Sequence, residues 1–480
     1  MLDGKCAGRV RLTVEPANLK ANAVAKGLSF TRTMTNNTKR TPPGPKGLPL
    51  LGMALELRKD PLGTLQRLAR EYGDIVAFSA AGMQRVLLNR PEYIQQLLVL
   101  DHAKFHKSKL TKLVVGPLLG QGLLISEGDF WRRQRRMMQP AFHRSRTNEY
   151  SPVMVDCALQ HSERWSGGET RDIAAEMMKL TLEVAVRTLF GTSLASDSDA
   201  IGRAMTFLQR YYLRRARTPW RLPESWPTAK NRRAKRELNL MDSMVYRIIS
   251  ERKKETQPRN DLLTLLMAAM HEDGTQMSER QLRDETMTLF LAGHETTALS
   301  LSWTWYLLSQ NPEAEACLHE ELHNVLGGRP AEVGDLEKLP YLNAVVNEVL
   351  RMFPPAFIMA RLNVETVRFG EYDIPPGRTV LASQWIMHRN PNYFDQPEKF
   401  LPERWSNGLQ ERLPAGVYFP FGDGPRRCIG QGFALLETAL VVAAIAQKFQ
   451  FRLVPGHPVI PEPLVTLRPK FGIRMQILSR

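Results

Sequence analysis

Residues 421–430 read FGDGPRRCIG and place one cysteine, Cys428, just before an apolar stretch, Phe433 to Phe449, that we expect to be helical. A sulfur at a helix N-terminus faces unpaired backbone N–H groups and the positive end of the helix dipole. We therefore expect the pKa of the Cys428 thiol to fall, which prepares the thiolate to bind a metal.

The residues around this cysteine indicate a flat ligand with an acidic group. Gly424 and Gly430 carry no side chain where such a ligand would approach the backbone. Phe421 offers an apolar face beside the sulfur, and Arg426 offers a charge for a carboxylate of the ligand. Haem has these properties and accepts a cysteine thiolate as iron ligand. The alternative is a buried, inert cysteine on a helix, the usual state of a lone cysteine.

The full spacing F-x-x-G-x-R-x-C-x-G resembles that of the cytochrome P450 superfamily of haem-thiolate monooxygenases. The resemblance implies a single, mainly α domain with a small β portion. It implies haem b (iron protoporphyrin IX) as cofactor, with Cys428 as the axial ligand of its iron. It also implies insertion of one oxygen atom from O2 into a C–H bond of a lipophilic small molecule. Three further segments, in the order typical of this family, extend the resemblance.

The longest helical pattern of the chain runs from Ser278 to Gln310. Ser278 with Gln281 predicts a capping box, and Asn311-Pro312 ends the pattern. Charged residues inside the pattern exclude a membrane span. A threonine hydroxyl in such a helix can donate to the carbonyl four residues earlier and bend the helix.

The centre of this pattern, residues 292–297, reads AGHETT and resembles the family motif [AG]-G-x-[DE]-T. The alternative is a contact of small residues between packed helices. The resemblance implies that Thr296 holds and protonates dioxygen and that Glu295 relays protons from solvent. Ala292 and Gly293 would leave room for oxygen and substrate, and we interpret His294 as structural.

Glu348 and Arg351 lie three residues apart in a helical pattern, Tyr341 to Met352, that stops before Pro354-Pro355. Alone, such a pair is usually a solvated surface bridge. The later segment 402–405, PERW, resembles the family segment whose arginine, here Arg404, completes a buried triad with them. The resemblance assigns the triad to the integrity of the fold and of the haem pocket.

Trp131 and Arg135 lie four residues apart, on one face of a helix expected at Asp129 to Gln139. They resemble the W-x-x-x-R element that binds a haem propionate. Arg361, ten residues after Arg351, resembles an arginine of the adjoining strand that meets a propionate as well.

Size and composition predict one large folded unit. Of 480 residues, 43% are hydrophobic and 24% charged, enough to bury a sizeable core. The four segments act on one haem, so we expect one catalytic domain at 41–480. Strand-like alternation is limited to 74–78, 85–89 and parts of 364–381.

Residues 1–40 hold eight basic and two acidic residues without an apolar anchor, and we expect a disordered tail.

The chain contains four cysteines, Cys6, Cys157, Cys317 and Cys428, and none is spaced from another as in a zinc or redox motif. A reducing, cytoplasmic location is the simplest expectation.

The formal net charge of +16 favours an acidic protein partner, since no segment resembles a nucleic-acid-binding module. Arg132, Arg133 and Arg136, with Arg427, border the thiolate side of the haem by the resemblance. We expect a separate ferredoxin or flavodoxin with its reductase to dock there. Only fifty-two residues follow Cys428, too few for a flavin or dinucleotide module. The alternative is a solvated helix face.

A second basic run, 214–217 and 232–236, is interleaved with Trp220 and Trp226. By the resemblance it lies in the lid above the substrate channel, where a peripheral contact with an anionic membrane surface stays open. The expected pocket segments are largely apolar and favour a lipophilic substrate: fatty acid, terpenoid, carotenoid or steroid. These segments are 105–125, 206–227, 289–292 and 356–359.

Two other functions remain open. A peroxygenase of the same fold would use hydrogen peroxide and no partner, but that subgroup replaces the acid-alcohol pair found here as Glu295 and Thr296. A non-catalytic haem sensor or carrier would bind haem without needing a proton relay. Nucleic-acid binding is a further alternative, although no segment resembles a nucleic-acid-binding module.

Overall fold

The computed structural model describes residues 41–480, except 192–197, 219–222, 256–258, 260 and 271–274. Residues Thr41–Arg480 form one folded unit. The predicted tail at 1–40 and Trp220 lie outside the described residues.

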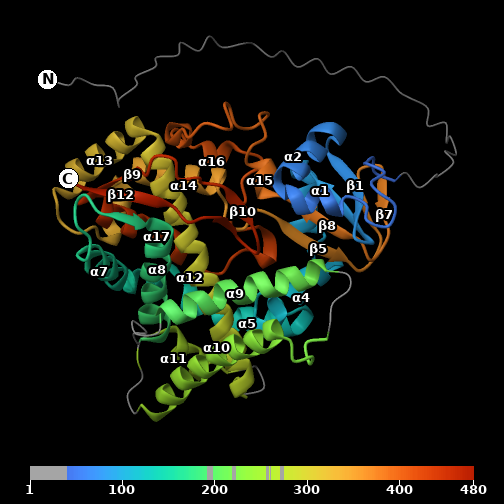
Figure 1. Ribbon diagram of the computed structural model, residues 1–480, viewed down its shortest axis with the longest axis horizontal. Coiled ribbons are helices and arrows are strands. Elements are labelled where there is room, and N and C mark those ends of the chain that lie inside the picture. The colour runs from blue at the N-terminus through green and yellow to red at the C-terminus, as the bar shows by residue number, and fades with distance from the viewer. Residues whose placement is uncertain (1–40, 192–197, 219–222, 256–258, 260, 271–274) are drawn as a thin grey trace, which may run out of the picture. The chain divides into compact units, whose positions relative to one another are not determined.

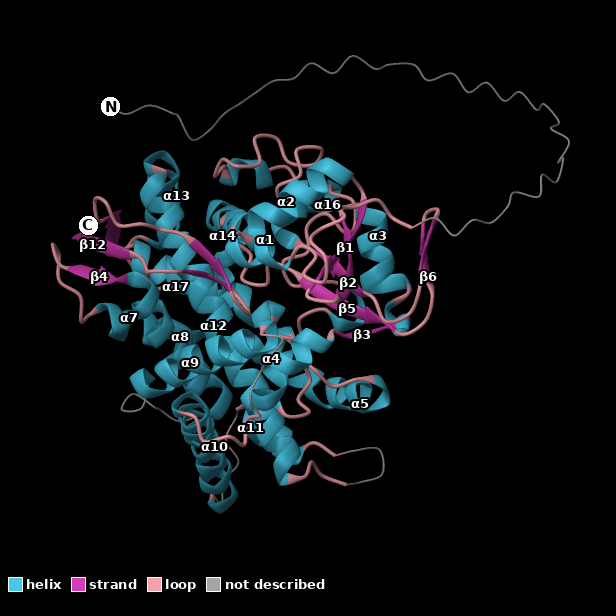
Figure 2. Cartoon of the chain, turned by 45° about the vertical axis from the view of Figure 1, so that its right-hand side comes forward, coloured by secondary structure: helices cyan, strands magenta, loops and turns pink. Residues whose placement is uncertain are grey.

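Helices dominate this unit, and the expected class of a mainly α fold with small sheets is confirmed (Figures 1 and 2). They are α1 (Ala54–Lys59), α2 (Pro61–Tyr72), α3 (Pro91–Gln95), α4 (Lys109–Leu119), α5 (Gly128–Met138), α6 (Arg144–Glu149), α7 (Ser151–Ser162), α8 (Ile173–Phe190), α9 (Ser198–Arg217), α10 (Ala229–Lys254), α11 (Leu262–Ala268), α12 (Glu279–Gln310), α13 (Pro312–Leu326), α14 (Pro340–Met352), α15 (Gln384–Met387), α16 (Leu409–Arg412) and α17 (Gln431–Ala446).

The largest sheet has five strands in the order β1-β2-β8-β5-β3, and the others have two or three. Strands β2 and β8 pair in parallel, with Val86 opposite Val380, while β5 runs antiparallel to both β8 and β3. The strands are β1 (Ile75–Ala80), β2 (Met83–Leu88), β3 (Phe105–Lys107), β4 (Thr170–Asp172), β5 (Met359–Asn363), β6 (Val367–Phe369), β7 (Tyr372–Ile374), β8 (Thr379–Ala382), β9 (Phe449–Leu453), β10 (Pro461–Pro463), β11 (Leu467–Pro469) and β12 (Arg474–Ser479).

Helix α12 runs through the core and packs on α8, α14, α17 and α10 (Figure 1). Ser278 caps it by accepting the Gln281 N–H at 3.2 Å, and Asn311 follows its last turn. The predicted helix and its N-cap are therefore confirmed. The predicted capping box is incomplete, because the side-chain amide of Gln281 has no hydrogen-bond partner among the described residues. Because partners surround it, most of its residues are buried, charged ones included.

Helix α17 begins three residues after Cys428 and is buried along most of its length. Apolar residues on all its faces match this position in the core. The predicted helix at 433–449 is confirmed except at its end. The polar pair Gln447 and Lys448 turns the chain, and Phe449 begins strand β9, which pairs with β12.

Candidate functional site

Cys428 lies in a tight loop just before α17. Its N–H donates to the Phe421 carbonyl at 3.0 Å, and the Arg427 N–H donates to the Gly424 carbonyl at 3.0 Å. Gly424 has φ 66°, and a Cβ there would lie 2.2 Å from the Leu98 carbonyl oxygen. Glycine is thus required because the backbone of residues 96–100 passes close to this position. We had expected that a ligand, not the protein backbone, would need this space. At Gly430 a Cβ would meet only Phe142, at 3.7 Å.

The predicted fall in the pKa of the Cys428 thiol is wrong for the protein alone. Burial raises this pKa and outweighs the lowering by the Gly430 N–H and by the charges of Arg135 and Arg427. The sequence showed the helix terminus but not the desolvation. Metal coordination is then what would hold the sulfur as a thiolate.

The sulfur of Cys428 is nevertheless reachable by solvent, unlike that of the buried free cysteine Cys157. Protein atoms surround Cys428 closely enough to desolvate its charged form, although the residue is exposed to solvent. An exposed cysteine in a desolvated position suits a bound group that completes the packing around it.

Arg426 does not point a free charge at this space. It donates to the Ser126 carbonyl at 2.7 Å and pairs with Glu127, and its guanidinium lies 4.1 Å from the centre of the Trp131 ring. Trp131 is buried on α5. Arg426 therefore stacks on the tryptophan expected to bind the cofactor.

Two further cations lie beside this pair. Lys107 of β3 and Arg361 of β5 stand opposite each other in register, and both are buried. Burial lowers the pKa of Arg361 to about 10, and burial with the charges of Arg361 and Arg426 lowers the pKa of Lys107 well below its usual value. Glu127 is the carboxylate that offsets these cations.

This cluster fits a ligand with two carboxylates, as haem has. Three buried or half-buried cations share one carboxylate, and no described residue pairs with the Lys107 amine. Buried charges are stable only when they are paired. Sequence reasoning missed Lys107 and Glu127, because neither lies in a recognised motif and β3 has only three residues.

Arg135 lies near the sulfur. It is half-buried, burial lowers its pKa, and the charge of Cys428 acts in the opposite direction. The structure thus brings the predicted Trp131, Arg135 and Cys428 segments together: Arg426 stacks on Trp131, and Arg135 is close enough for its charge to act on both Arg426 and Cys428.

One face of α12 also borders open space. Ala292 is exposed and Thr296 half-exposed, between stretches of buried residues. The Thr296 hydroxyl donates to the Ala292 carbonyl at 2.7 Å, the bond expected for a threonine in this motif. A Cβ on Gly293 would meet only Leu189 of α8, at 3.8 Å. Small residues therefore open this helix face.

Glu295 points to the other side, into a network that the sequence did not reveal. Its carboxylate pairs with Arg468 of β11 and accepts from Thr466 and from Gln209 of α9. Burial favours the neutral acid, but Arg468 and these hydrogen bonds prevail and lower the pKa of Glu295. The acid is thus ionised and fully bonded.

His294 is buried and its Nε2 lies 2.9 Å from the Met178 carbonyl of α8, in keeping with a structural role. Its own carbonyl accepts from the Thr181 hydroxyl at 3.0 Å. These bonds tie α12 to α8 beside the motif.

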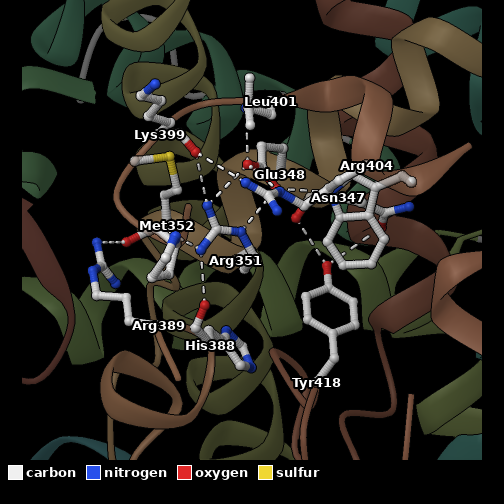
Figure 3. A network of polar contacts seen from close by, with 12 residues as sticks. Asn347, Glu348, Arg351, Met352, His388, Arg389, Lys399, Leu401, Arg404 and Tyr418 are labelled. Atoms are coloured by element: carbon white, nitrogen blue, oxygen red, sulfur yellow. Dashed lines mark hydrogen bonds and ion pairs between the residues drawn. The ribbon is translucent and has the colours of Figure 1, made fainter. Parts of the chain in front are cut away.

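Glu348, Arg351 and Arg404 meet in one buried network (Figure 3). Arg351 binds both oxygens of Glu348, at 2.8 and 2.9 Å, and Arg404 binds one at 2.9 Å. Arg351 also donates to the carbonyls of His388 and Pro397, and Trp405 donates to Glu348. Every charge has partners, as a buried ion group requires.

The predicted docking arginines Arg132, Arg133, Arg136 and Arg427 are all exposed. Arg132 pairs with Asp129 at 2.8 Å, and Arg427 donates to Gln431 at 2.6 Å. None of the helices described here is long and apolar enough to cross a bilayer.

Comparison with known proteins agrees with this geometry. The family model described as "Cytochrome P450" matches residues 42–474. "Cyclooctatin synthase" of Streptomyces melanosporofaciens is 38% identical over 426 residues, 88% of this chain and 92% of that protein. "Cyclooctat-9-en-7-ol 5-monooxygenase" of the same organism is 35% identical, over 87% and 91% of the two chains. "Pentalenene oxygenase" of Streptomyces avermitilis is 30% identical, over 93% and 99%.

A match over nearly the whole catalytic unit, with a reachable cysteine beside a buried basic cluster, leads to one conclusion. The chain belongs to the cytochrome P450 family and is a haem-dependent monooxygenase, an oxidoreductase.

Proposed function

We propose that this protein hydroxylates a C–H bond of a lipophilic small molecule, with electrons from a separate acidic ferredoxin or flavodoxin. The observation that carries the proposal is the solvent-reachable Cys428 sulfur, desolvated by protein and close to Arg135. Haem b, bound through this sulfur, would supply the activation of dioxygen.

The residues proposed to hold the haem lie on both sides of the cysteine loop. Lys107 and Arg361, with Trp131 and Arg135, would bind its carboxylates, and Arg426 would fix the Trp131 ring from its position 4.1 Å away. Phe421 would pack beside the sulfur. Gly424 and Gly430 shape the loop, and Ala292 and Gly293 leave space on the α12 face.

The proposed proton route uses Thr296 and Glu295. The Thr296 hydroxyl borders the open face of α12, where it can donate to a reacting oxygen after releasing the Ala292 carbonyl. Glu295 lines a large cavity on the other side of the helix and can take up protons from there. It accepts a proton only when Arg468 moves away, because that ion pair lowers its pKa.

Two named relatives support a lipophilic substrate, since their names give cyclooctat-9-en-7-ol and pentalenene as what they oxidise. The predicted pocket segments contribute buried apolar residues such as Phe105, Leu119, Leu289 and Phe357. Screening a lipid library for the spectral shift that substrate binding causes at the haem would identify the substrate.

Thr296→Ala tests the proton route. The variant should bind haem normally but divert electrons from product to hydrogen peroxide, measured as product and peroxide formed per electron supplied by a surrogate reductase. Thr304→Ala is the matched control, because Thr304 makes the same backbone bond, to Ser300 at 2.8 Å, farther along α12. Unchanged coupling in Thr296→Ala would refute this role for Thr296.

A further inference from the structure

The cavity that Glu295 lines lies behind α12. Its volume is about 1130 Å³, and its walls come mainly from α8, α9, α12, the start of α10 and the β10–β11 hairpin, with Arg58 of α1. Figure 1 shows α9 crossing in front of α12, with α10 next to it. The cavity shares Glu295 with the proposed proton route but contains none of the residues proposed to hold haem.

This cavity is strongly basic. Eight lysines and arginines line it, against three carboxylates. Each carboxylate already has a partner in the protein. Glu295 pairs with Arg468, Glu462 pairs with Arg210 at 3.1 Å, and Asp172 accepts the N–H groups that begin α8.

Four lining cations have no such partner. Arg58 of α1, Arg203 and Arg214 of α9, and Lys230 of α10 make no side-chain hydrogen bond or ion pair with any described residue. They come from three separate helices and face one hollow. All four are exposed, so solvent screens their mutual repulsion, and an anion that enters the hollow could interact with several of them at once.

The arrangement on α9 supports a bound ligand. Arg203, Phe207, Arg210 and Arg214 are spaced by four, three and four residues and so form one stripe of the helix. Arg233 of α10 lies over the Phe207 ring at 4.2 Å, which holds the two helices together beside the stripe.

The inner wall adds an independent observation. His294 and Arg468 line the cavity, and each is less than a tenth exposed, at 2% and 7%. The Nε–H of Arg468 has no hydrogen-bond partner in the described part of the chain and could donate to an anion. The Nδ1 of His294 is unpartnered as well, but it is an acceptor, because the Nε2–H donates to the Met178 carbonyl. Buried polar atoms of this kind normally bind a protein group, water or a ligand.

We propose that this cavity binds a ligand that carries two or more phosphate groups. Arginine forks and lysine amines are the side chains best suited to phosphate oxygens. A concave site of this size suits a small molecule or a lipid headgroup better than a protein surface. Two sources share this chemistry, a free phosphate ester and an anionic lipid that reaches the cavity with its headgroup.

Calorimetric titration of the full-length holoenzyme with pyrophosphate at low ionic strength tests the site. The wild type should bind, and the triple variant Arg203→Gln, Arg214→Gln, Lys230→Gln should bind about tenfold more weakly. The matched control is Arg232→Gln, Lys235→Gln, Arg236→Gln. This control also removes three positive charges, but from exposed positions of α10 outside the cavity, and it should bind pyrophosphate as tightly as the wild type does.

Flotation with vesicles that contain cardiolipin, a lipid with two phosphate groups, compared with phosphatidylcholine vesicles, separates the two sources. If the wild type and the control bind the anionic vesicles and the triple variant does not, the ligand is a lipid headgroup. Binding of pyrophosphate alone would identify a free phosphate compound. The proposal is overturned if neither probe binds, or if both triple variants lose binding equally. These readouts do not depend on turnover, so they can fail while the monooxygenase proposal stands.

Discussion

At the scale of the residue, burial decides the state of the chemical groups. It raises the pKa of the Cys428 thiol despite the helix that follows, and it lowers the pKa of Arg361 to about 10. Glu295 is buried as well, yet Arg468 keeps its pKa low. The charge state of each functional group therefore depends on whether a partner offsets the desolvation of its charged form.

Glu348→Ala should prevent haem incorporation. The change leaves Arg351, which is 0% exposed, without its carboxylate, and removing one member of a buried ion group costs about 3 to 5 kcal/mol. Haem content per protein, from absorption, measures the effect. Glu398→Ala is the control, because Glu398 also pairs with a buried arginine, Arg389, but is itself 69% exposed. A normally loaded, active Glu348→Ala protein would refute the role assigned to the triad.

At the scale of the element, one buried ion pair links three segments. Glu295 of α12 binds Arg468 of β11, and both bind Gln209 of α9. Residues 214–217 at the end of α9 belong to the predicted lid, and we expect any movement of α9 with this lid to disturb the bonds of the proposed proton donor.

Arg468→Met should lower the midpoint of thermal unfolding strongly, because it leaves the Glu295 carboxylate buried without a cation, at a cost of about 3 to 5 kcal/mol. Adding Glu295→Leu should restore much of the loss. Arg210→Met, which breaks a pair that is 52% and 24% exposed, should cost less than about 1 kcal/mol. Equal effects of Arg468→Met and Arg210→Met would contradict the strength we assign to the buried pair.

At the scale of the whole molecule, charge is distributed unevenly in a chain of net charge +16. One basic group, Arg132, Arg133, Arg136 and Arg427, lies on and near the segments that flank Cys428. The second surrounds the cavity behind α12. The two groups suit different partners, because the first is an exposed surface and the second is concave.

Charge reversal at Arg132, Arg133 and Arg136 should slow reduction by an acidic ferredoxin, and added salt should slow the wild type in the same way. Stopped-flow reduction of the haem measures the rate. Reversal at Arg232, Lys235 and Arg236 of α10 is the control and should change the rate little. A rate that is insensitive both to salt and to the first set of reversals would rule out this docking surface.

Much of the fold could be predicted because its signals are local. The cap at Ser278, the stop after Met352 and the alternation in β1 and β2 each depend on a few neighbouring residues. The end of α17 was misplaced, since strand β9 forms only by pairing with β12 from the end of the chain.

The site could be predicted only where a motif marks it. Lys107, Gln209 and Arg468 act through partners that lie more than eighty residues away or on another strand. No motif or spacing in the sequence predicts these pairs. The predicted direction of the Cys428 pKa shift was wrong for the same reason, because desolvation depends on how the surrounding residues pack.

The absorption spectrum of the reduced protein under carbon monoxide tests the central claim most directly. Iron held by the Cys428 thiolate should give the far-red-displaced Soret band of haem-thiolate proteins, and Cys428→Ala should lack it. An undisplaced band in the wild type, or a displaced one in Cys428→Ala, would contradict the account.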